Sequence, residues 1–175
     1  MMTNNASQRR FLVVGGTGML APLCQALPPK ELVIAARFVS HHSQLLTFSN
    51  AVQRVELDYH SVPSANGFLQ NLALWPNMQS CILWVHSPAQ SFSQAVIQAF
   101  AQRRKPPHII EVLGSQATPT DLSRIAKLNP IRRTTVRLGR HQEPTGWRWL
   151  THREISATVA VPLMKDHPAL GLDRI

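Results

Sequence analysis

Short apolar runs recur along the chain, and each is followed by a longer stretch of mixed polar and apolar residues. Runs of about four to eight residues rich in Val, Ile and Leu are typical of buried strands. Six runs fit that description, at 11–14, 31–36, 52–57, 81–85, 108–113 and 134–138. Because most of them are apolar throughout, they predict strands of a parallel sheet with both faces covered.

The stretches between the runs predict helices, at 19–27, 40–48, 64–74, 88–102, 118–128 and 151–164. In the helix at 88–102, Phe92, Val96 and Phe100 recur at helical spacing. The last helix opens on Thr151 and Glu154, which have the spacing of a capping box. Alternating strands and helices, together with the right-handed crossover rule, predict an α/β fold: a Rossmann-like, doubly wound parallel sheet of six strands with helices on both faces.

The pattern is less regular between the sixth strand and the last helix. Residues 141–146 are polar and contain Pro144 and Gly146, which predicts a loop. Residues 147–150 predict a short seventh strand at the edge of the sheet. We expect the alternating Trp147 and Trp149 to place one ring in the core and the other over a site or an interface.

The size and composition of the chain fit a single globular domain. It has 175 residues, of which 44% are hydrophobic and 15% charged. The polar residues 1–10 predict a disordered N-terminal tail. No apolar run approaches the roughly 20 residues of a membrane span, and Cys24 and Cys81 lie in apolar segments that predict buried thiols. We therefore expect a cytoplasmic protein with no membrane partner.

Charge is distributed unevenly. The chain has 18 Lys and Arg against 9 Asp and Glu, a net charge of +9, and most of the surplus falls in residues 103–175. A basic surface attracts nucleic acids, anionic cofactors and anionic substrates alike. The short basic runs at 103–105 and 132–133 have the pattern of solvated faces. A phosphorylated dinucleotide and an anionic small molecule explain the surplus better than a nucleic acid does.

A glycine-rich turn follows the first strand. Gly15, Gly18 and Ala21 form G-x-x-G-x-x-A, and counting from Gly16 gives G-x-G-x-x-A. Glycines at these places allow a tight turn and a close approach of backbone to a pyrophosphate, and the helix N-terminus favours phosphate. The predicted phosphate turn is Gly15, Gly16, Thr17, Gly18 and Met19. Residues 11–175 are thus expected to form a single NAD(P)-binding Rossmann domain.

Residues at two further strand ends bear on which dinucleotide would bind. The second strand ends on Arg37, where NAD sites usually carry a carboxylate for the ribose hydroxyls. Arg37 is expected to pair with a 2′-phosphate, so NADP(H) is favoured over NAD(H). The alternative is a solvated arginine. Asp58, after the third strand, is a candidate contact for the adenine; it is equally a candidate turn or capping residue.

The turn at 15–21, Arg37, the pair 57–58 and Trp-Val-His-Ser at 84–87 together resemble the short-chain dehydrogenase/reductase superfamily across nearly the whole chain. Residues 137–139 and 149–156 more narrowly resemble small bacterial proteins of that type. The resemblance implies a cofactor lying across the carboxyl ends of the strands. It also implies a Tyr in Y-x-x-x-K as proton donor and a Ser after the fifth strand.

The family's catalytic pattern is incomplete in this chain. The only tyrosine is Tyr59, which is not in a Y-x-x-x-K motif. Ser115 stands where the family places its carbonyl-polarising Ser, and Lys127, in Ser123-x-x-x-Lys127, has the family-like spacing of the ribose-binding Lys. The alternative is that Lys127 is a solvent-exposed charge on the predicted helix.

His86 is the best candidate acid, because it follows the fourth strand at the edge where open parallel sheets bind ligands. A histidine can also exchange a proton near neutral pH. The alternative is a structural histidine bonded to backbone. Ser87 is expected to approach the nicotinamide or to cap the next helix. Glu111, a charge inside the fifth strand, predicts an ion pair with a basic residue of the second half.

Two functions remain open. The first is an NADP(H)-dependent oxidoreductase of the short-chain dehydrogenase type. The second is a non-catalytic NADP(H)-binding sensor or regulatory protein that has lost the catalytic Tyr and Lys. No histidine or cysteine has metal-ligand spacing, so we expect no metal. The outer face of the helix at 88–102 is a candidate contact for a homo-oligomer.

Overall fold

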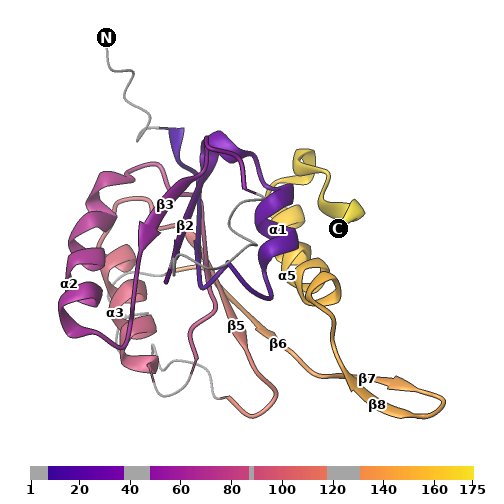
Figure 1. The fold of residues 1–175 in the computed structure, drawn as a ribbon. Coiled ribbons are helices and arrows are strands. Elements are labelled where there is room, and N and C mark those ends of the chain that lie inside the picture. The colour runs from indigo at the N-terminus through magenta and orange to yellow at the C-terminus, as the bar shows by residue number, and fades with distance from the viewer. Residues whose placement is uncertain (1–7, 38–47, 87–88, 118–130) are drawn as a thin grey trace.

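Six parallel strands form the centre of the molecule, in the order β3-β2-β1-β4-β5-β6 (Figure 1). The structure is a computed structural model and describes residues 8–37, 48–86, 89–117 and 131–175. The predicted helices at 40–48 and 118–128 lie almost entirely outside these residues. The strands are β1 (Phe11–Val14), β2 (Leu32–Ala36), β3 (Gln53–Glu56), β4 (Ser80–Leu83), β5 (His108–Leu113) and β6 (Arg133–Arg137). The predicted doubly wound sheet of six strands is confirmed.

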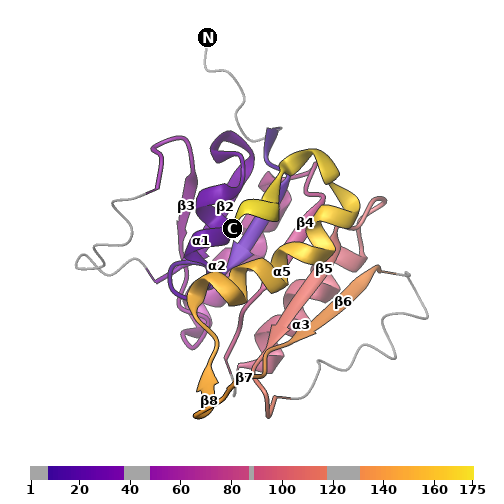
Figure 2. The ribbon, with the colours of Figure 1, turned by 90° about the vertical axis from the view of Figure 1, so that its right-hand side faces the viewer.

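Helices cover both faces of this sheet. On one face lie α1 (Ala21–Ala26) and α5 (His152–Asp166), side by side (Figures 1 and 2). On the other lie α2 (Val62–Asn71) and α3 (Gln90–Ala101). Short 3₁₀ turns occupy Pro29–Glu31, Leu72–Leu74, Pro168–Leu170 and Leu172–Arg174. Side chains alternate along each strand, so each face contributes to a separate core.

The two cores account for the apolar pattern of the sequence. Phe11 and Val13 of β1 pack with the α1–α5 side, and Leu12 and Val14 with the α2–α3 side. The stripe of α3 packs inward against the sheet, at Phe92, Val96 and Phe100. The outward positions of α3 include the exposed Ser91, Gln94 and Gln98. Its outer face is therefore polar, and the homo-oligomer stays a prediction.

The helix α5 begins as the sequence predicts. Thr151 Oγ1 accepts a hydrogen bond from the Glu154 N–H at 3.2 Å, and the Glu154 carboxylate accepts from the Thr151 N–H at 2.8 Å. This reciprocal pair is a capping box, and it begins α5 near the ends of β1 and β4, since His152 lines one pocket together with Gly15 and Trp84.

The prediction for 141–150 is confirmed in part: a short strand does include Trp147 and Trp149, but it is not at the edge of the main sheet, and residues 141–143 are a strand rather than a loop. Instead of a loop and an edge strand, β7 (Arg140–Glu143) and β8 (Gly146–Trp149) pair with each other as an antiparallel hairpin separate from the main sheet. The hairpin projects beyond the sheet (Figures 1 and 2). Trp147 and Trp149 share one of its faces, because residues two apart in a strand point the same way. Both are 64% exposed, so neither ring is in the core.

The two residues that precede β1, Arg9 and Arg10, already contact neighbouring segments of the fold. Arg9 is 6% exposed, and its guanidinium donates to the carbonyl oxygens of Leu32 and Ala51 at 3.1 and 3.0 Å. Arg10 forms an ion pair with Glu31 at 3.1 Å. Residues 9 and 10 therefore do not belong to a disordered tail, because their head groups satisfy carbonyls and a carboxylate of neighbouring segments.

Cys24 and Cys81 are both buried and free, as predicted. Burial raises the pKa of both thiols, so they stay protonated at neutral pH. Among the described residues, no helix has the length and apolar character needed to cross a membrane.

Candidate functional site

The three glycines after β1 lie in different surroundings, and not all of them exclude a side chain. Gly15 has φ of +80°, and a Cβ there would overlap the carbonyl oxygen of Trp84. A Cβ on Gly16 would lie 2.7 Å from Val13 Cγ1 and 2.8 Å from Cys24 Sγ. Gly18 differs, because a Cβ there would meet nothing within 4 Å. The first two glycines allow close packing, whereas Gly18 leaves open space beside the turn.

Three hydrogen bonds fix the position of this turn. The Gly15 N–H donates to the Ala35 carbonyl at 2.9 Å, which ties the turn to β2. The Ser156 hydroxyl of α5 donates to the Met19 carbonyl at 3.1 Å, and the Cys24 thiol lies 3.6 Å from the Gly16 carbonyl. The turn is thus held from three directions. The helix that follows it, α1, begins only at Ala21.

A pocket of about 530 Å³, which we call the turn pocket, opens beside the glycines. It lies at the carboxyl ends of β1 to β4. Its lining residues are Gly15, Thr17, Gly18, Met19, Ala36, Arg37, Leu57, Tyr59, Trp84, His86 and His152. The cationic or titratable groups among them are Arg37, Tyr59, His86 and His152, and none of these lining residues is a carboxylate. The described wall therefore suits an anion.

The two residues after β3 take different positions. Asp58 is not among the residues lining the turn pocket: its Oδ1 accepts from the His60 N–H at 3.0 Å, and its own N–H donates to Ser64 Oγ at 3.0 Å. Tyr59 does line the pocket, and its hydroxyl lies 3.4 Å from the His86 backbone N. Sequence reasoning missed Tyr59, although its place after a strand end was the available signal.

A second hollow, which we call the hairpin pocket, has a volume of about 640 Å³. Met19, Trp84 and His86 line both pockets, so the two adjoin along the carboxyl ends of the strands, and together we call them the crevice. The other residues that line the hairpin pocket are Val85, Val112, Leu113, Gly114, Ser115, Gln116, Ala117, Leu138, Gly139, Arg140, Trp149, Leu150 and Ile155. The crevice thus runs from the glycine turn to the hairpin.

The candidate catalytic residues lie in this crevice where the structure describes them. His86 is exposed at the junction of the pockets, and its ring packs edge-on to Trp84 with centroids 5.0 Å apart. Ser115 is exposed in the hairpin pocket, and its carbonyl accepts from Arg137 at 3.1 Å. Ser87 and Lys127 lie outside the described residues. The predicted residues Arg37, His86 and Ser115 therefore line the two adjoining pockets of the crevice.

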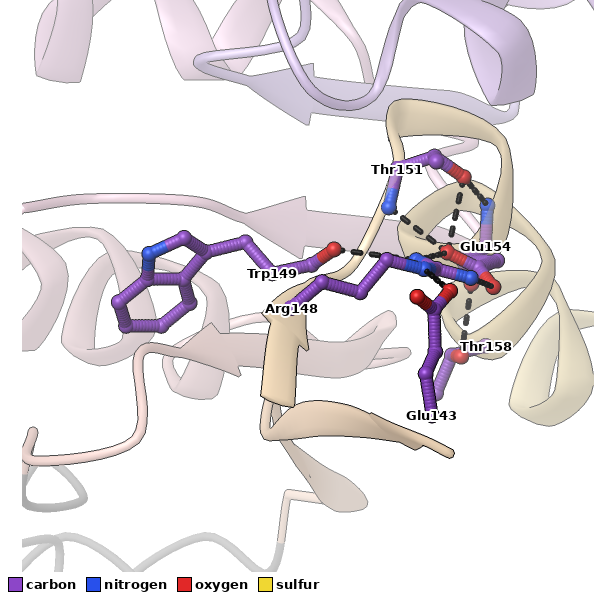
Figure 3. A network of polar contacts seen from close by, with 6 residues as sticks. All are labelled: Glu143, Arg148, Trp149, Thr151, Glu154 and Thr158. Carbon is purple, nitrogen blue, oxygen red and sulfur yellow. Dashed lines mark hydrogen bonds and ion pairs between the residues drawn. The ribbon is translucent and has the colours of Figure 1, made fainter. Parts of the chain in front are cut away.

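An ion-pair network anchors the hairpin to α5 (Figure 3). Arg148 contacts Glu154 through both terminal nitrogens at 2.8 Å, and its Nε contacts Glu143 at 2.5 Å. Hydrogen bonds from Arg148, followed by those from Thr151, hold the pKa of Glu154 well below its usual range. Hydrogen bonds to the two carboxylates raise the pKa of Arg148. The bidentate geometry fixes the orientation of β8.

Glu111 of β5 is a buried carboxylate that takes part in an ion pair. It is 3% exposed, and its carboxylate pairs with Arg133 of β6. The predicted partner in the basic half of the chain is confirmed. Among the described residues, no group of three His, Cys, Asp or Glu side chains could hold a metal ion.

Comparison with known proteins identifies the fold. No protein-family model matches the sequence, and no curated protein matches it. A short-chain dehydrogenase/reductase family protein is similar in structure, with a TM-score of 0.57 at 13% identity over 91% of this chain and 90% of that one. A proposed epimerase from Bacteroides thetaiotaomicron has a TM-score of 0.55 at 9% identity, over 93% of each chain.

The enzyme WbmF of Bordetella bronchiseptica, crystallised with NAD⁺ and UDP, has a TM-score of 0.51 at 13% identity. The similarity covers 90% of this chain and 57% of WbmF. At such identities the likeness concerns the fold. The strand order, the glycine turn after β1 and these similarities agree. The chain has a Rossmann-type fold, similar to that of these dehydrogenase/reductase and epimerase structures.

Proposed function

We propose that this protein is an NADP(H)-binding oxidoreductase of the short-chain dehydrogenase type. The observation that carries the proposal is the pair of adjoining pockets along the carboxyl ends of the strands, with the glycine turn in one, Ser115 in the other and His86 lining both. Ligands of open α/β sheets bind at this edge. The described lining of both pockets contains no carboxylate, which suits a polyanionic cofactor.

The residues of the turn pocket fit such a cofactor. Gly15 to Met19 would hold the pyrophosphate, because Gly18 leaves open space where a side chain would stand. Arg37 follows β2, is exposed and lines the pocket, so it would pair with the 2′-phosphate. Asp58 does not line the pocket and would contribute indirectly, because its carboxylate fixes the turn that carries Tyr59.

The bound cofactor would supply or accept a hydride, and this chain's own residues would manage the proton. His86 would donate a proton to the oxygen of a reduced carbonyl group, or accept one from an alcohol in the reverse direction. The Ser115 hydroxyl would donate a hydrogen bond to the same oxygen and orient it. From the sequence alone, Lys127 is proposed to contact the nicotinamide ribose, and Ser87 the cofactor.

The cofactor assignment is tested with Arg37→Gln. We expect NADPH to bind this variant about tenfold more weakly than the wild type, since a charge-assisted hydrogen bond is lost. NADH affinity should stay unchanged. Arg104→Gln removes an exposed charge that lies outside the crevice lining and serves as the matched control. Quenching of tryptophan fluorescence reports binding, because Trp84 lines the pocket. Equal loss of both cofactors would contradict the 2′-phosphate role.

The second candidate function is a non-catalytic NADP(H) sensor. The observation that favours it is the position of the only tyrosine: Tyr59 lines the turn pocket, whereas Ser115 lines the hairpin pocket. The family's Tyr–Ser pair is therefore absent. Hydride turnover on a panel of carbonyl compounds, repeated with His86→Ala and Ser115→Ala, separates the two functions. Turnover that both variants reduce supports the enzyme; firm NADPH binding without any turnover supports the sensor.

A further inference from the structure

The hairpin pocket has a chemistry of its own. Its described walls are mostly apolar and come from four parts of the chain: the end of β5, the end of β6, the segment after β8, and α5. They are formed by Val112, Leu113, Leu138, Leu150 and Ile155. Met19 and Trp84 add apolar surface at the junction with the turn pocket. Such walls favour an apolar ligand body over a sugar or a peptide backbone.

The side chain of Trp149 provides a flat surface at the rim. Trp149 lines the hairpin pocket and is 64% exposed. In Figure 3 its indole extends away from the Arg148 head group, which is bound to α5. Because Arg148 fixes β8 through Glu143 and Glu154, the indole is presented from an anchored strand. An exposed ring held in this way is suited to stacking against another ring.

The two neighbouring arginines of the hairpin differ in their partners. Arg148 contacts two carboxylates. Arg140 has its guanidinium over the Trp149 ring, 4.5 Å from the centroid, and within the described part of the chain it forms no ion pair. Stacking on an aromatic ring orients a guanidinium without neutralising it. Arg140 therefore offers an oriented positive charge at the mouth of an apolar pocket.

We infer that the hairpin pocket binds a substrate with an apolar, ring-bearing body and one anionic group, the ring against Trp149 and the anion on Arg140. The inference rests on the proposed function, and it supplies the substrate class. The group to be reduced or oxidised would lie toward His86 and Ser115, which also line this pocket.

Ligand binding tests this inference without requiring turnover. The probes are naphthalene-2-carboxylate, its neutral isostere naphthalene-2-carboxamide, and octanoate, an anion without a ring. Each is titrated into the full-length protein, with and without NADPH, by nuclear magnetic resonance. We expect the naphthoate to bind about five- to twentyfold more tightly than the carboxamide, and more tightly than octanoate.

Variants of the hairpin locate the binding site. Arg140→Gln should abolish the difference between naphthoate and carboxamide, whereas Arg104→Gln should leave it unchanged. Trp149→Leu should weaken both aromatic probes severalfold. Trp147→Leu is the matched control, since Trp147 is equally exposed on the same strand but does not line the pocket. Circular dichroism confirms that each variant keeps its fold.

The outcomes keep this inference separate from the cofactor assignment. Equal affinity of naphthoate and carboxamide, no naphthoate binding even at millimolar concentration, or equal losses in Trp147→Leu and Trp149→Leu would each overturn it. If the probes behave as expected but NADPH does not bind, the proposed cofactor fails while the pocket's ligand class stands.

Discussion

The two ends of the sheet carry similar residue types in very different arrangements. At the amino end, a hollow of about 600 Å³ is lined in part by His108, Arg132, Asp166 and His167. His108 Nδ1 lies 2.6 Å from Asp166 Oδ2, and His108 Nε2 lies 2.8 Å from Thr134 Oγ1. Arg132 binds the other Asp166 oxygen at 2.5 Å. These polar groups satisfy one another.

The carboxyl end is different. Within the described chain, the side chains of Arg37, His86 and Ser115 have no hydrogen bond or ion pair, and Arg140 has only the ring of Trp149. A buried or half-buried group that is already paired contributes to stability, whereas an available one can contact a ligand. A hollow with titratable residues is thus a candidate site only when those residues are available, which singles out the crevice.

The largest expected effect separates two glycines of the turn. Gly15→Ala should lower the free energy of unfolding by about 3 kcal/mol or more, because the residue has a left-handed φ and no room for a Cβ. Gly18→Ala should change the free energy of unfolding by less than about 1 kcal/mol, because its Cβ would meet no other atom of the protein. The same substitution should weaken NADPH binding, because the Cβ would occupy space proposed for the pyrophosphate. Urea unfolding and cofactor titration measure the two effects. Equal destabilisation by both substitutions would contradict the packing argument.

A smaller effect tests the amino end. Asp166→Asn should destabilise the fold by about 2 kcal/mol at neutral pH, because His108 and Arg132 lose a charged partner. Burial opposes ionisation of Asp166, but hydrogen bonds from His108 and Arg132 outweigh it and lower its pKa. The stabilisation is therefore present above the ordinary aspartate pKa of about 3.9 and is lost as the pH falls through the lower folded value.

Urea unfolding at several pH values measures this contribution, and NADPH titration supplies its control. The Asn variant should lose less stability than the wild type on acidification, and its NADPH affinity should be unchanged. A drop in NADPH affinity without a drop in stability would mean that the amino end takes part in binding.

The smallest effect concerns the anchored hairpin. Hydrogen bonds from Arg148, followed by those from Thr151, lower the pKa of Glu154, so the anchor should persist at a pH near 4, where a free glutamate is half protonated. The anchor should be lost only at lower pH, as Glu154 protonates in the folded state. Glu154→Gln should release the hairpin already at neutral pH. Near-ultraviolet circular dichroism of Trp147 and Trp149 reports the release, and a wild-type transition at the ordinary glutamate pKa would contradict the anchor.

The sheet could be predicted from the sequence because its four central strands, β1, β2, β4 and β5, are buried on both faces. The run at 108–113 is the clearest case, since β5 has these limits and every residue of it is buried. The capping box at Thr151 could be predicted for a local reason, because it involves only adjacent residues. Signals of this kind depend on burial or on near neighbours, which the order of residues records directly.

The strand β8 overlaps the strand predicted at 147–150, but β7 and the pairing of the two strands could not be predicted. The four residues of β7 are all polar, so this segment lacks the alternating pattern of a half-buried strand. The stability of the hairpin comes from Arg148 bridging to α5, a contact set by the three-dimensional structure. Tyr59 was missed similarly: its place in the turn pocket depends on β3 lying two strands from β1 in the sheet.

Hydrogen exchange with and without NADPH tests the contrast between the two ends most directly. The account predicts slower exchange on NADPH addition at residues 15–19 and 84–86, with no change at 105–108 or 164–167. Absence of any protection, or protection confined to the amino end, would contradict the assignment of the crevice as the cofactor site.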